Sequence, residues 1–411
     1  MKICFFNRSY WPDQAATGQL LAELAEDLVS RHGCEVTVVA GRAVAGRETV
    51  RARLRPVGRE THNGVRILRA GGTTLRPRRF AGRVANYLSY TASAALASLD
   101  IGRPDVVVAL TDPPVIGRVA LWAARRAGAR FVFLCEDVFP EVAALIDGFR
   151  STAVDRTLDR INRRLLRDAD AIVALGDRMR RRLIDEKGAA AERIQVIHNW
   201  ADCDAIQPGS KDNPFSRAHG LADRFVVMHS GNVGLSQNLE VVIDAADRLR
   251  AKERLVFAVV GDGARREHLE RAAAARSLSN VRFFPYQPKE RLRDSFAAAD
   301  LFLVSLKAGI EGYIVPSKVY GILAAGRPYV AAVDPACEAA QIARAFDCGV
   351  WAAPGEAGAL AAAVAGLYDD PERAAAMGVR ARSAAWQFDR RAAVAAYHDL
   401  FTRVARMARA A

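Results

Sequence analysis

The chain has 411 residues, 51% of them apolar, and a formal net charge of +13. This length exceeds what one hydrophobic core usually supports, so we expect a well-packed soluble protein of two domains. No apolar run reaches the ~18 residues that cross a bilayer, and the N-terminus turns polar too soon for a secretory signal, while the charge indicates an acidic partner: nucleic acid, an anionic membrane or phosphorylated substrates.

The cysteines are widely spaced and include no Cys-x-x-Cys pair. Several stand in apolar runs, such as residues 1–6 and 131–137, where a free thiol behaves as a small hydrophobe. We therefore expect a reducing compartment, a cytoplasmic location and no zinc site. The six are Cys4, Cys34, Cys135, Cys203, Cys337 and Cys348.

The first 41 residues set the pattern of the N-terminal half. An apolar strand at 2–7 is followed by a loop, an amphipathic helix at 19–32 and a second strand at 35–41. Apolar strands that alternate with helices predict a parallel sheet covered on both faces. The alternation continues with strands at 104–111, 130–137, 171–175 and 193–199.

Residues 201–224 break this rhythm with Pro, Gly, Ser and Asp and predict a linker. The alternation then restarts, and alanine-rich helices end the chain. We predict an α/β protein of two Rossmann-like, doubly wound parallel-sheet domains, with a ligand in the cleft between them at the carboxyl ends of the strands. The predicted parts are an N-terminal domain at 1–200, a linker at 201–222, a C-terminal domain at 223–384 and helices at 385–411 that pack back towards the N-terminal domain.

The segment 314–333, IVPSKVYGILAAGRPYVAAV, opens with Pro316, Ser317 and Lys318. Proline suits a first helical turn, where the free N–H groups and the helix dipole favour an anion. A hydroxyl and an ammonium add to that preference, so these residues are a candidate seat for a diphosphate. A core helix that begins with proline and carries a surface lysine is the alternative.

A glycine-containing loop follows the first strand of the C-terminal domain, in the sequence HSGNVGLSQN. Gly231 and Gly234 permit close backbone approach, and Asn232 and Gln237 supply amide donors, as a phosphate-binding loop requires. A turn without a ligand is the simpler alternative. His229 stands beside this loop.

The order of several motifs resembles the retaining family 4 glycosyltransferases of the GT-B fold, over nearly the whole chain. These motifs are SGNVGLSQNLE (230–240), VVGDG (259–263), the surroundings of Glu311, and VPSKVYGILAAGRP (315–328). With DVFPEVAALIDG (137–148) and VIHNWAD (196–202), the chain is similar to bacterial transferases of O-antigen, capsule and colanic acid assembly, the fucosamine-transferase-like subgroup in particular.

The resemblance implies metal-independent transfer of a sugar, possibly an N-acetylated deoxyhexosamine, from a nucleotide-diphosphate donor, UDP-linked by expectation, with no tightly bound cofactor. The acceptor is a saccharide or a polyprenyl-diphosphate-linked saccharide of cell-surface polysaccharide synthesis. In such enzymes the N-terminal domain binds the acceptor and the C-terminal domain the nucleotide sugar.

The family usually carries Glu-x7-Glu in this segment, and this chain departs from it. If residues 326–328 fix the alignment, the second Glu, which holds the ribose, falls on Gly321. Glu311 stands two residues before the place of the first, whose carboxylate lies against the transferred sugar. The family also has Arg and Lys near Asn232 and Gln237, so Lys318 is expected to carry more of the diphosphate charge here.

Two further candidates lie in the N-terminal half. Thr17 and Gly18 precede a predicted helix, and the family's matching glycine faces the donor phosphate or the acceptor, although a capped helix start explains them too. Many relatives have a histidine near Glu136 and Asp137, and here Asp137, Glu136 or Glu141 could orient the acceptor hydroxyl or take its proton. Helix capping by Asp137 is the alternative.

Two motifs are set aside. DCD (202–204) imitates an Asp-x-Asp metal motif of another glycosyltransferase fold, but GT-B enzymes neutralise the leaving diphosphate with the protein, so no metal is expected. GDGARR (261–266) lacks the third glycine of a dinucleotide fingerprint, so a nicotinamide site is not expected.

Positive charge concentrates mainly in the N-terminal domain. In 75–90, arginines interleave with Phe80, Tyr87 and Leu88, a mixture that suits an anionic bilayer surface, so we expect a peripheral position at the inner face of the cytoplasmic membrane. A solvated basic face is the alternative. Two other functions stay open, a non-hydrolysing UDP-sugar epimerase and a basic nucleic-acid binder, although the arginines do not line one helix and nucleic acid is not the expected partner. The basic segments are 46–60, 75–90, 159–168 and 177–186.

Overall fold

A computed structural model of the chain describes residues 1–13, 15–42, 57–73, 80–146 and 151–407. Their contacts divide the chain into two compact units. The first comprises the described residues of Met1–Pro140, Arg150–His198 and Ala393–Ala411, and the second those of Glu141–Phe149 and Asn199–Ala392. Each unit contains one sheet, and the predicted α/β class with two doubly wound sheets is confirmed.

The sheet of the first unit has eight strands among the described residues, in the order β3-β4-β2-β1-β5-β6-β7-β8. Every neighbouring pair is parallel except the edge pair β3–β4. The central strands are apolar runs buried on both faces, as parallel strands require. The strands are β1 (Lys2–Phe6), β2 (Glu35–Gly41), β3 (Val57–His62), β4 (Val65–Ala70), β5 (Val106–Ala109), β6 (Arg130–Cys135), β7 (Ala171–Ala174) and β8 (Ile194–Val196).

The β3–β4 hairpin was not predicted, although its turn has a sequence signal. Asn63 and Gly64 join the two strands, and His62 pairs with Val65 across the turn. Both turn residues have positive φ, 47° and 79°, the conformation of a two-residue hairpin turn that Asn-Gly favours. The Asn-Gly pair therefore marks this turn, although β3 before it is polar and largely exposed.

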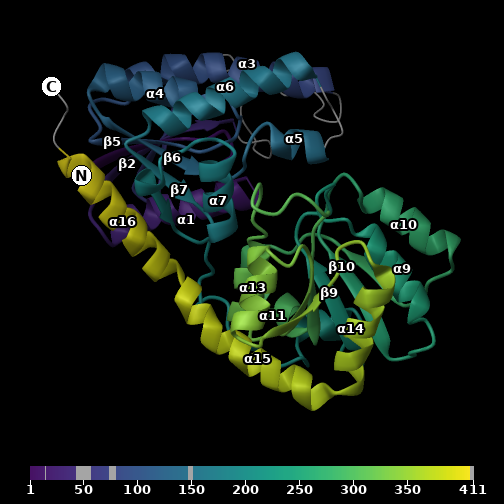
Figure 1. The fold of residues 1–411 in the computed structure, drawn as a ribbon. Coiled ribbons are helices and arrows are strands. Elements are labelled where there is room, and N and C mark those ends of the chain that lie inside the picture. The colour runs from purple at the N-terminus through teal and green to yellow at the C-terminus, as the bar shows by residue number, and fades with distance from the viewer. Residues whose placement is uncertain (14, 43–56, 74–79, 147–150, 408–411) are drawn as a thin grey trace. The chain divides into compact units, whose positions relative to one another are not determined.

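Helices cover both faces of the first sheet, with α3, α4 and α6 on one side and α1 and α16 on the other (Figure 1). On the α16 side, the ring of Phe401 lies edge-on to that of Phe5 in β1, with centroids 6.0 Å apart. The C-terminal helix is thus part of the core of the first unit. The helices are α1 (Ala16–Ser30), α3 (Phe80–Ala97), α4 (Ile116–Ala127), α6 (Thr152–Asp168), α7 (Asp177–Asp185) and α16 (Arg390–Arg406).

The sheet of the second unit is parallel throughout, in the order β11-β10-β9-β12-β13-β14. Its strands are β9 (Phe225–Ser230), β10 (Leu255–Val260), β11 (Val281–Phe284), β12 (Leu301–Ser305), β13 (Tyr329–Ala332) and β14 (Gly349–Ala352). The helices of this unit are α5 (Glu141–Ile146), α8 (Pro214–Ala218), α9 (Glu240–Arg248), α10 (Arg266–Ala275), α11 (Leu292–Ala297), α12 (Lys318–Ala324), α13 (Glu338–Ala345), α14 (Ala357–Asp369) and α15 (Pro371–Ala385).

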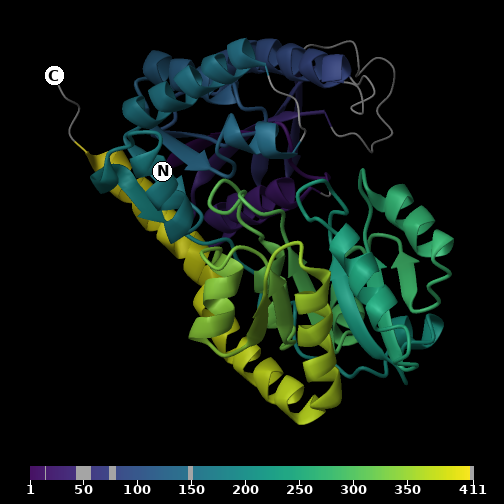
Figure 2. The ribbon, with the colours of Figure 1, turned by 45° about the vertical axis from the view of Figure 1, so that its right-hand side comes forward.

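Two apolar cores lie on the two faces of this sheet, between the helices that Figure 2 shows on either side. On one face, alternate strand residues such as Val227 and Phe257 pack with α9, α10 and α14. On the other, residues such as Met228 and Phe302 pack with α11, α12 and α13. The period of two along each strand thus divides one run of apolar residues between two cores.

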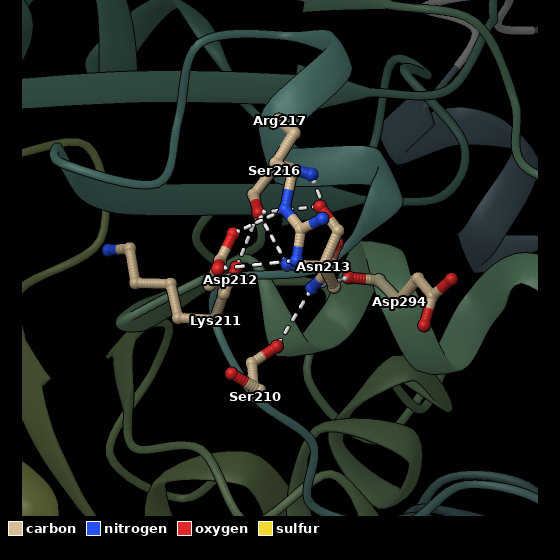
Figure 3. Close-up of polar contacts among 7 residues, drawn as sticks. All are labelled: Ser210, Lys211, Asp212, Asn213, Ser216, Arg217 and Asp294. Carbon is tan, nitrogen blue, oxygen red and sulfur yellow. Dashed lines mark hydrogen bonds and ion pairs between the residues drawn. The ribbon is translucent and has the colours of Figure 1, made fainter.

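The segment predicted as a linker is ordered within the second unit. Asn213 and Ser216 form a reciprocal capping box at the start of α8, with two hydrogen bonds of 3.0 Å (Figure 3). The Asn213 amide also donates to the carbonyls of Ser210 and Asp294, which ties α8 to α11. Proline, serine and asparagine therefore act here as helix-start residues.

Candidate active site

The chain reverses its direction of growth in the second sheet between β9 and β12. From β9 the strands proceed outward to β11, and the next strand, β12, returns to the other side of β9. In open parallel sheets, ligands bind outside the carboxyl ends of the strands at such a switch point. The loop at 231–239 leaves β9 there, and the segment 306–317 leaves β12 at the same edge.

Lys318 and His229 meet at this edge. The ammonium nitrogen of Lys318 lies 3.4 Å from both ring nitrogens of His229, whose side chain is buried. The Nε2 atom of His229 is 3.3 Å from the carbonyl oxygen of Asn232, which can only accept, so Nε2 carries the proton and Nδ1 accepts from Lys318. Sequence analysis singled out both residues but not their contact.

The environment shifts the pKa values of both groups downward. Burial lowers the pKa of Lys318 to about 7. Burial, and then the charge of Lys318, lower the pKa of His229 well below its usual value. His229 is therefore neutral at physiological pH, while Lys318 is only partly protonated until an anion arrives to stabilise its charge.

The backbone of the glycine loop after β9 contacts the backbone of the loop after β10. The N–H of Gly231 donates to the carbonyl of Val260, and that of Val233 donates to Asp262, each at 2.9 Å. Gly261 has φ of 141°, and a Cβ atom there would stand 1.9 Å from the carbonyl oxygen of Gly231. The GDG sequence thus has a structural purpose, since it lets two backbones touch beneath the candidate phosphate loop.

Within this loop, the side chain of Gln237 forms a hydrogen bond with the backbone. Its side-chain oxygen accepts from the N–H of Gly234 at 3.1 Å, so that N–H is already used. Asn232 is exposed, and Gly231 has φ of 121°, with Lys318 Nζ 3.9 Å from the place of a Cβ atom. The N–H of Gly231 is used as well, so Asn232 and the Lys318 ammonium are the groups best placed for an anion, and Gly231 contributes the space beside them.

The helix behind Lys318 is shorter than the sequence indicates. It starts at Lys318, with Ser317 as its N-cap, and ends at Ala324, a length of seven residues. Pro316 is buried and precedes the cap, so it does not occupy the first helical position. Such a short helix has a small dipole, and the full charge of Lys318 is the stronger attraction for an anion.

Gly321 stands at the place of the second family glutamate, and Glu311 lies two residues before the place of the first. Glu311 is buried, and its charge adds to burial and to Glu338 in raising the pKa of Cys337. A Cβ atom on Gly321 would lie 3.2 Å from the ring of Phe296 and 3.9 Å from Ile206. A side chain at position 321 would enter the apolar core, so this position does not face a ribose.

In the first unit, polar side chains gather where β1, β5 and β6 end. Glu136 and Asp137 follow β6, and the N–H of Asp137 donates to the Thr111 hydroxyl at 3.3 Å. Asp112, which sequence analysis missed, follows β5 and pairs with Arg8 after β1 at 3.1 Å. The first sheet has its own switch point between β1 and β5, so these groups too lie where ligands bind.

Two of these carboxyl groups have raised pKa values. Burial, and then the charge of Asp112, raise the pKa of Asp137 to about 7. Burial, and then Asp137, raise the pKa of Glu136 to about 8. Carboxyl groups that titrate near neutrality can exchange protons with a substrate, which an ordinary surface carboxylate does poorly.

Thr17 and Gly18 lie inside the first turn of α1, which starts at Ala16, rather than before the helix. Gly18 is buried, and a Cβ atom there would stand 3.2 Å from the backbone of Ser9 and of Tyr10. The glycine therefore has a packing role, because it lets the helix approach the loop after β1.

The motifs set aside have structural partners. The side chain of Asp202 accepts from the N–H groups of Asp204 and Ala205, and Asp204 pairs with Arg391. Among the described residues, no cluster of three His, Cys, Asp or Glu side chains has the placement of a metal site. All six cysteines are free and buried. Of the helices described here, none has the length and apolar character to cross a membrane.

Two families account for most of the chain. Residues 16–200 match the Glycosyl transferase 4-like domain, and residues 212–384 match the Glycosyl transferases group 1 family. Each of these two segments thus matches a glycosyltransferase family, and the predicted GT-B fold is confirmed.

Two curated relatives cover part of the chain. WcaI of Escherichia coli K12, named as a colanic acid biosynthesis glycosyl transferase, is 31% identical over 59% of this chain and 61% of its own. WbjE of Pseudomonas aeruginosa, named as a glycosyltransferase, is 29% identical over 58% and 60%. The chain thus matches about 60% of the length of these relatives.

A solved structure covers nearly all of it. Anabaena Alr3699/HepE in complex with UDP-glucose superposes with a TM-score of 0.75 at 19% identity, over 98% of this chain and 100% of that one. At this identity the likeness establishes the fold.

Proposed function

We propose that this protein is a retaining glycosyltransferase that moves a sugar from a UDP-sugar to a saccharide or polyprenyl-diphosphate-linked saccharide in cell-surface polysaccharide synthesis. The observation that carries the proposal is the Lys318 ammonium beside the Gly231 loop, at the switch point of a group 1 domain. The name of WcaI supports the pathway, and the UDP-glucose in HepE supports the donor.

In this mechanism the second unit binds the donor. The diphosphate approaches the backbone at Gly231, where a side chain would obstruct it, and Lys318 neutralises the charge that grows as the sugar departs. His229 stays neutral and holds the ammonium by its Nδ1 atom. Lys318 is thus a catalytic residue of the proposal and His229 a positioning residue. Glu311 is proposed to act on the transferred sugar, as the resemblance implies.

The first unit is proposed to bind the acceptor. Asp137, with Glu136 beside it, takes the proton of the attacking hydroxyl, and its raised pKa suits that task. Retention of configuration rests on the family resemblance.

Changing Asp137 to Asn is expected to lower kcat by about 10²-fold or more, because the amide cannot accept the proton. Wild-type turnover should rise with pH through about 7, where Asp137 ionises, and this rise should disappear in the variant. Stopped-assay kinetics at saturating donor, where the bound diphosphate keeps Lys318 protonated, measures both effects across pH 6–8. Full turnover by a folded Asp137→Asn protein would remove the residue from the chemistry.

Binding of the donor can be tested without an acceptor. UDP at 100 times its Kd should raise the free energy of unfolding by about 2.7 kcal/mol, which a thermal-shift panel of nucleotides detects. Stabilisation by random RNA and not by UDP would favour the nucleic-acid binder. A new isomer formed from a UDP-sugar alone would favour the epimerase.

A further inference from the structure

A groove lies on the helical surface of the first unit. It has a volume of about 310 Å³ and runs between α4 and α6, which Figure 1 shows side by side. Its lining consists of four arginines, three aliphatic side chains and one tryptophan: Arg118, Arg125, Arg160, Arg164, Leu121, Ile161, Leu165 and Trp122.

Helix packing explains the apolar floor. Gly117 lets α6 approach α4, since a Cβ atom there would lie 2.5 Å from Leu165. Leu121 and Leu165 are buried beside this contact, while the arginines and Trp122 are exposed. Residues 118, 121, 122 and 125 share one face of α4 by helical spacing, so the cations stand above an apolar base.

The charge of the groove is unbalanced. Arg125 and Arg164 both contact one carboxylate, that of Asp168, at 2.9 and 3.4 Å. The ion pairs found among the described residues include none for Arg118 or Arg160. Among the described residues, Asp168 is thus the one carboxylate found paired with any of these four guanidinium groups, and the indole of Trp122, 47% accessible, completes the lining.

We propose that this groove binds the phosphate headgroup of an anionic phospholipid and thereby holds the first unit at a membrane surface. Guanidinium groups bind phosphate through paired hydrogen bonds, and tryptophan prefers the boundary between headgroups and acyl chains. The aliphatic floor suits the glycerol and first methylenes of the lipid. Binding of a nucleic-acid strand usually requires several aromatic side chains on which successive bases stack, and the lining of the groove has one aromatic residue.

The inference deepens the proposed function, because a transferase for a lipid-linked acceptor must work at a membrane. It uses different residues and a different readout, so either idea can fail alone. Stabilisation by UDP without binding to lipid would support the donor site and contradict the groove. Binding to lipid without stabilisation by UDP would support the groove and contradict the donor site.

The test is sedimentation of the full chain with vesicles of neutral lipid and vesicles that contain anionic phosphatidylglycerol. The wild type should bind the anionic vesicles far better. The double variant Arg118→Gln with Arg160→Gln should lower that partition coefficient about 30-fold, as loss of two basic residues near an anionic surface predicts. The matched control is Arg248→Gln with Arg373→Gln, two exposed arginines of the second unit, and should change partition less than about 3-fold.

Equal losses in the two double variants would show that binding follows net charge, which overturns the groove. The proposal would also be overturned if binding of the wild type to vesicles did not depend on lipid charge. The same holds if short RNA competes for the protein and additional anionic vesicles do not. If soluble glycerophosphate saturates the groove and vesicles do not bind, the ligand is a free phosphate and the membrane role is wrong. UDP stabilisation in the groove variant reports an intact fold.

Discussion

Methionine in place of Lys318 is expected to weaken binding of UDP-glucose by about 10- to 150-fold at pH 6.5. The change keeps the apolar stem and removes the charge, and a hydrogen bond to a charged group contributes about 1.5–3 kcal/mol. The loss should appear in donor KM or kcat as well. Isothermal titration with UDP-glucose measures it directly.

The pH dependence of the wild type gives the same prediction a second readout. With a free-state pKa of about 7, Lys318 must take up a proton to bind the diphosphate at higher pH. Affinity should therefore be constant well below pH 7 and fall by about tenfold per unit above it. UDP-glucose is the right probe, because both of its phosphoryl groups are esterified and do not titrate in this range.

In the Lys318→Met variant this slope should vanish. Lys252→Met, which removes an ammonium of the same unit that pairs with Asp369, is the control and should retain wild-type affinity and slope. Unchanged affinity in Lys318→Met, or a wild-type affinity that is flat from pH 6 to 8.5, would exclude Lys318 from the donor site.

Alanine in place of Gly261 is expected to destabilise the second unit by about 3 kcal/mol or more and to abolish donor binding. The added methyl would stand 1.9 Å from the carbonyl oxygen of Gly231, and the backbone at φ of 141° disfavours any side chain. One of the two loops must move, and either movement displaces the backbone that is proposed to face the diphosphate. Chemical denaturation and UDP titration measure the two effects.

The matched control is Gly366→Ala in α14, where nothing lies within 4 Å of the added atom. This change should raise the free energy of unfolding by about 0.5–1 kcal/mol, since alanine is the better helix former. Wild-type stability and UDP affinity in Gly261→Ala would mean that the loops after β9 and β10 do not support each other.

Much of the fold was predictable because its signals are local. A run of six apolar residues such as 255–260, short and rich in valine, indicates a buried strand, and the prediction of two parallel sheets is confirmed. The hairpin at 57–70 was not predicted, although Asn63-Gly64 is a sequence signal for a hairpin turn. The helix at Lys318 was expected to begin at Pro316. It begins later, because the carbonyls of Pro316 and Ser317 accept the hydrogen bonds of tight turns.

The candidate site was predictable only as separate residues. Lys318 and His229 stand 89 positions apart, and neither shows alone that the pKa of the lysine is lowered. Asp112 was overlooked because a single carboxylate after a strand is common. Its effect on the pKa of Asp137 exists only because β5 and β6 are neighbours.

The residue pattern by itself determined the α/β class, the repeated strand–helix order and the motifs that could serve a diphosphate. Only the tertiary structure decided which strands adjoin, and with them the meeting of a lysine, a histidine and two glycine loops at one sheet edge. The physical reason is that periodicity and turn preference act over a few residues, whereas burial, backbone contact and the pKa of a charge depend on neighbours that folding brings from afar.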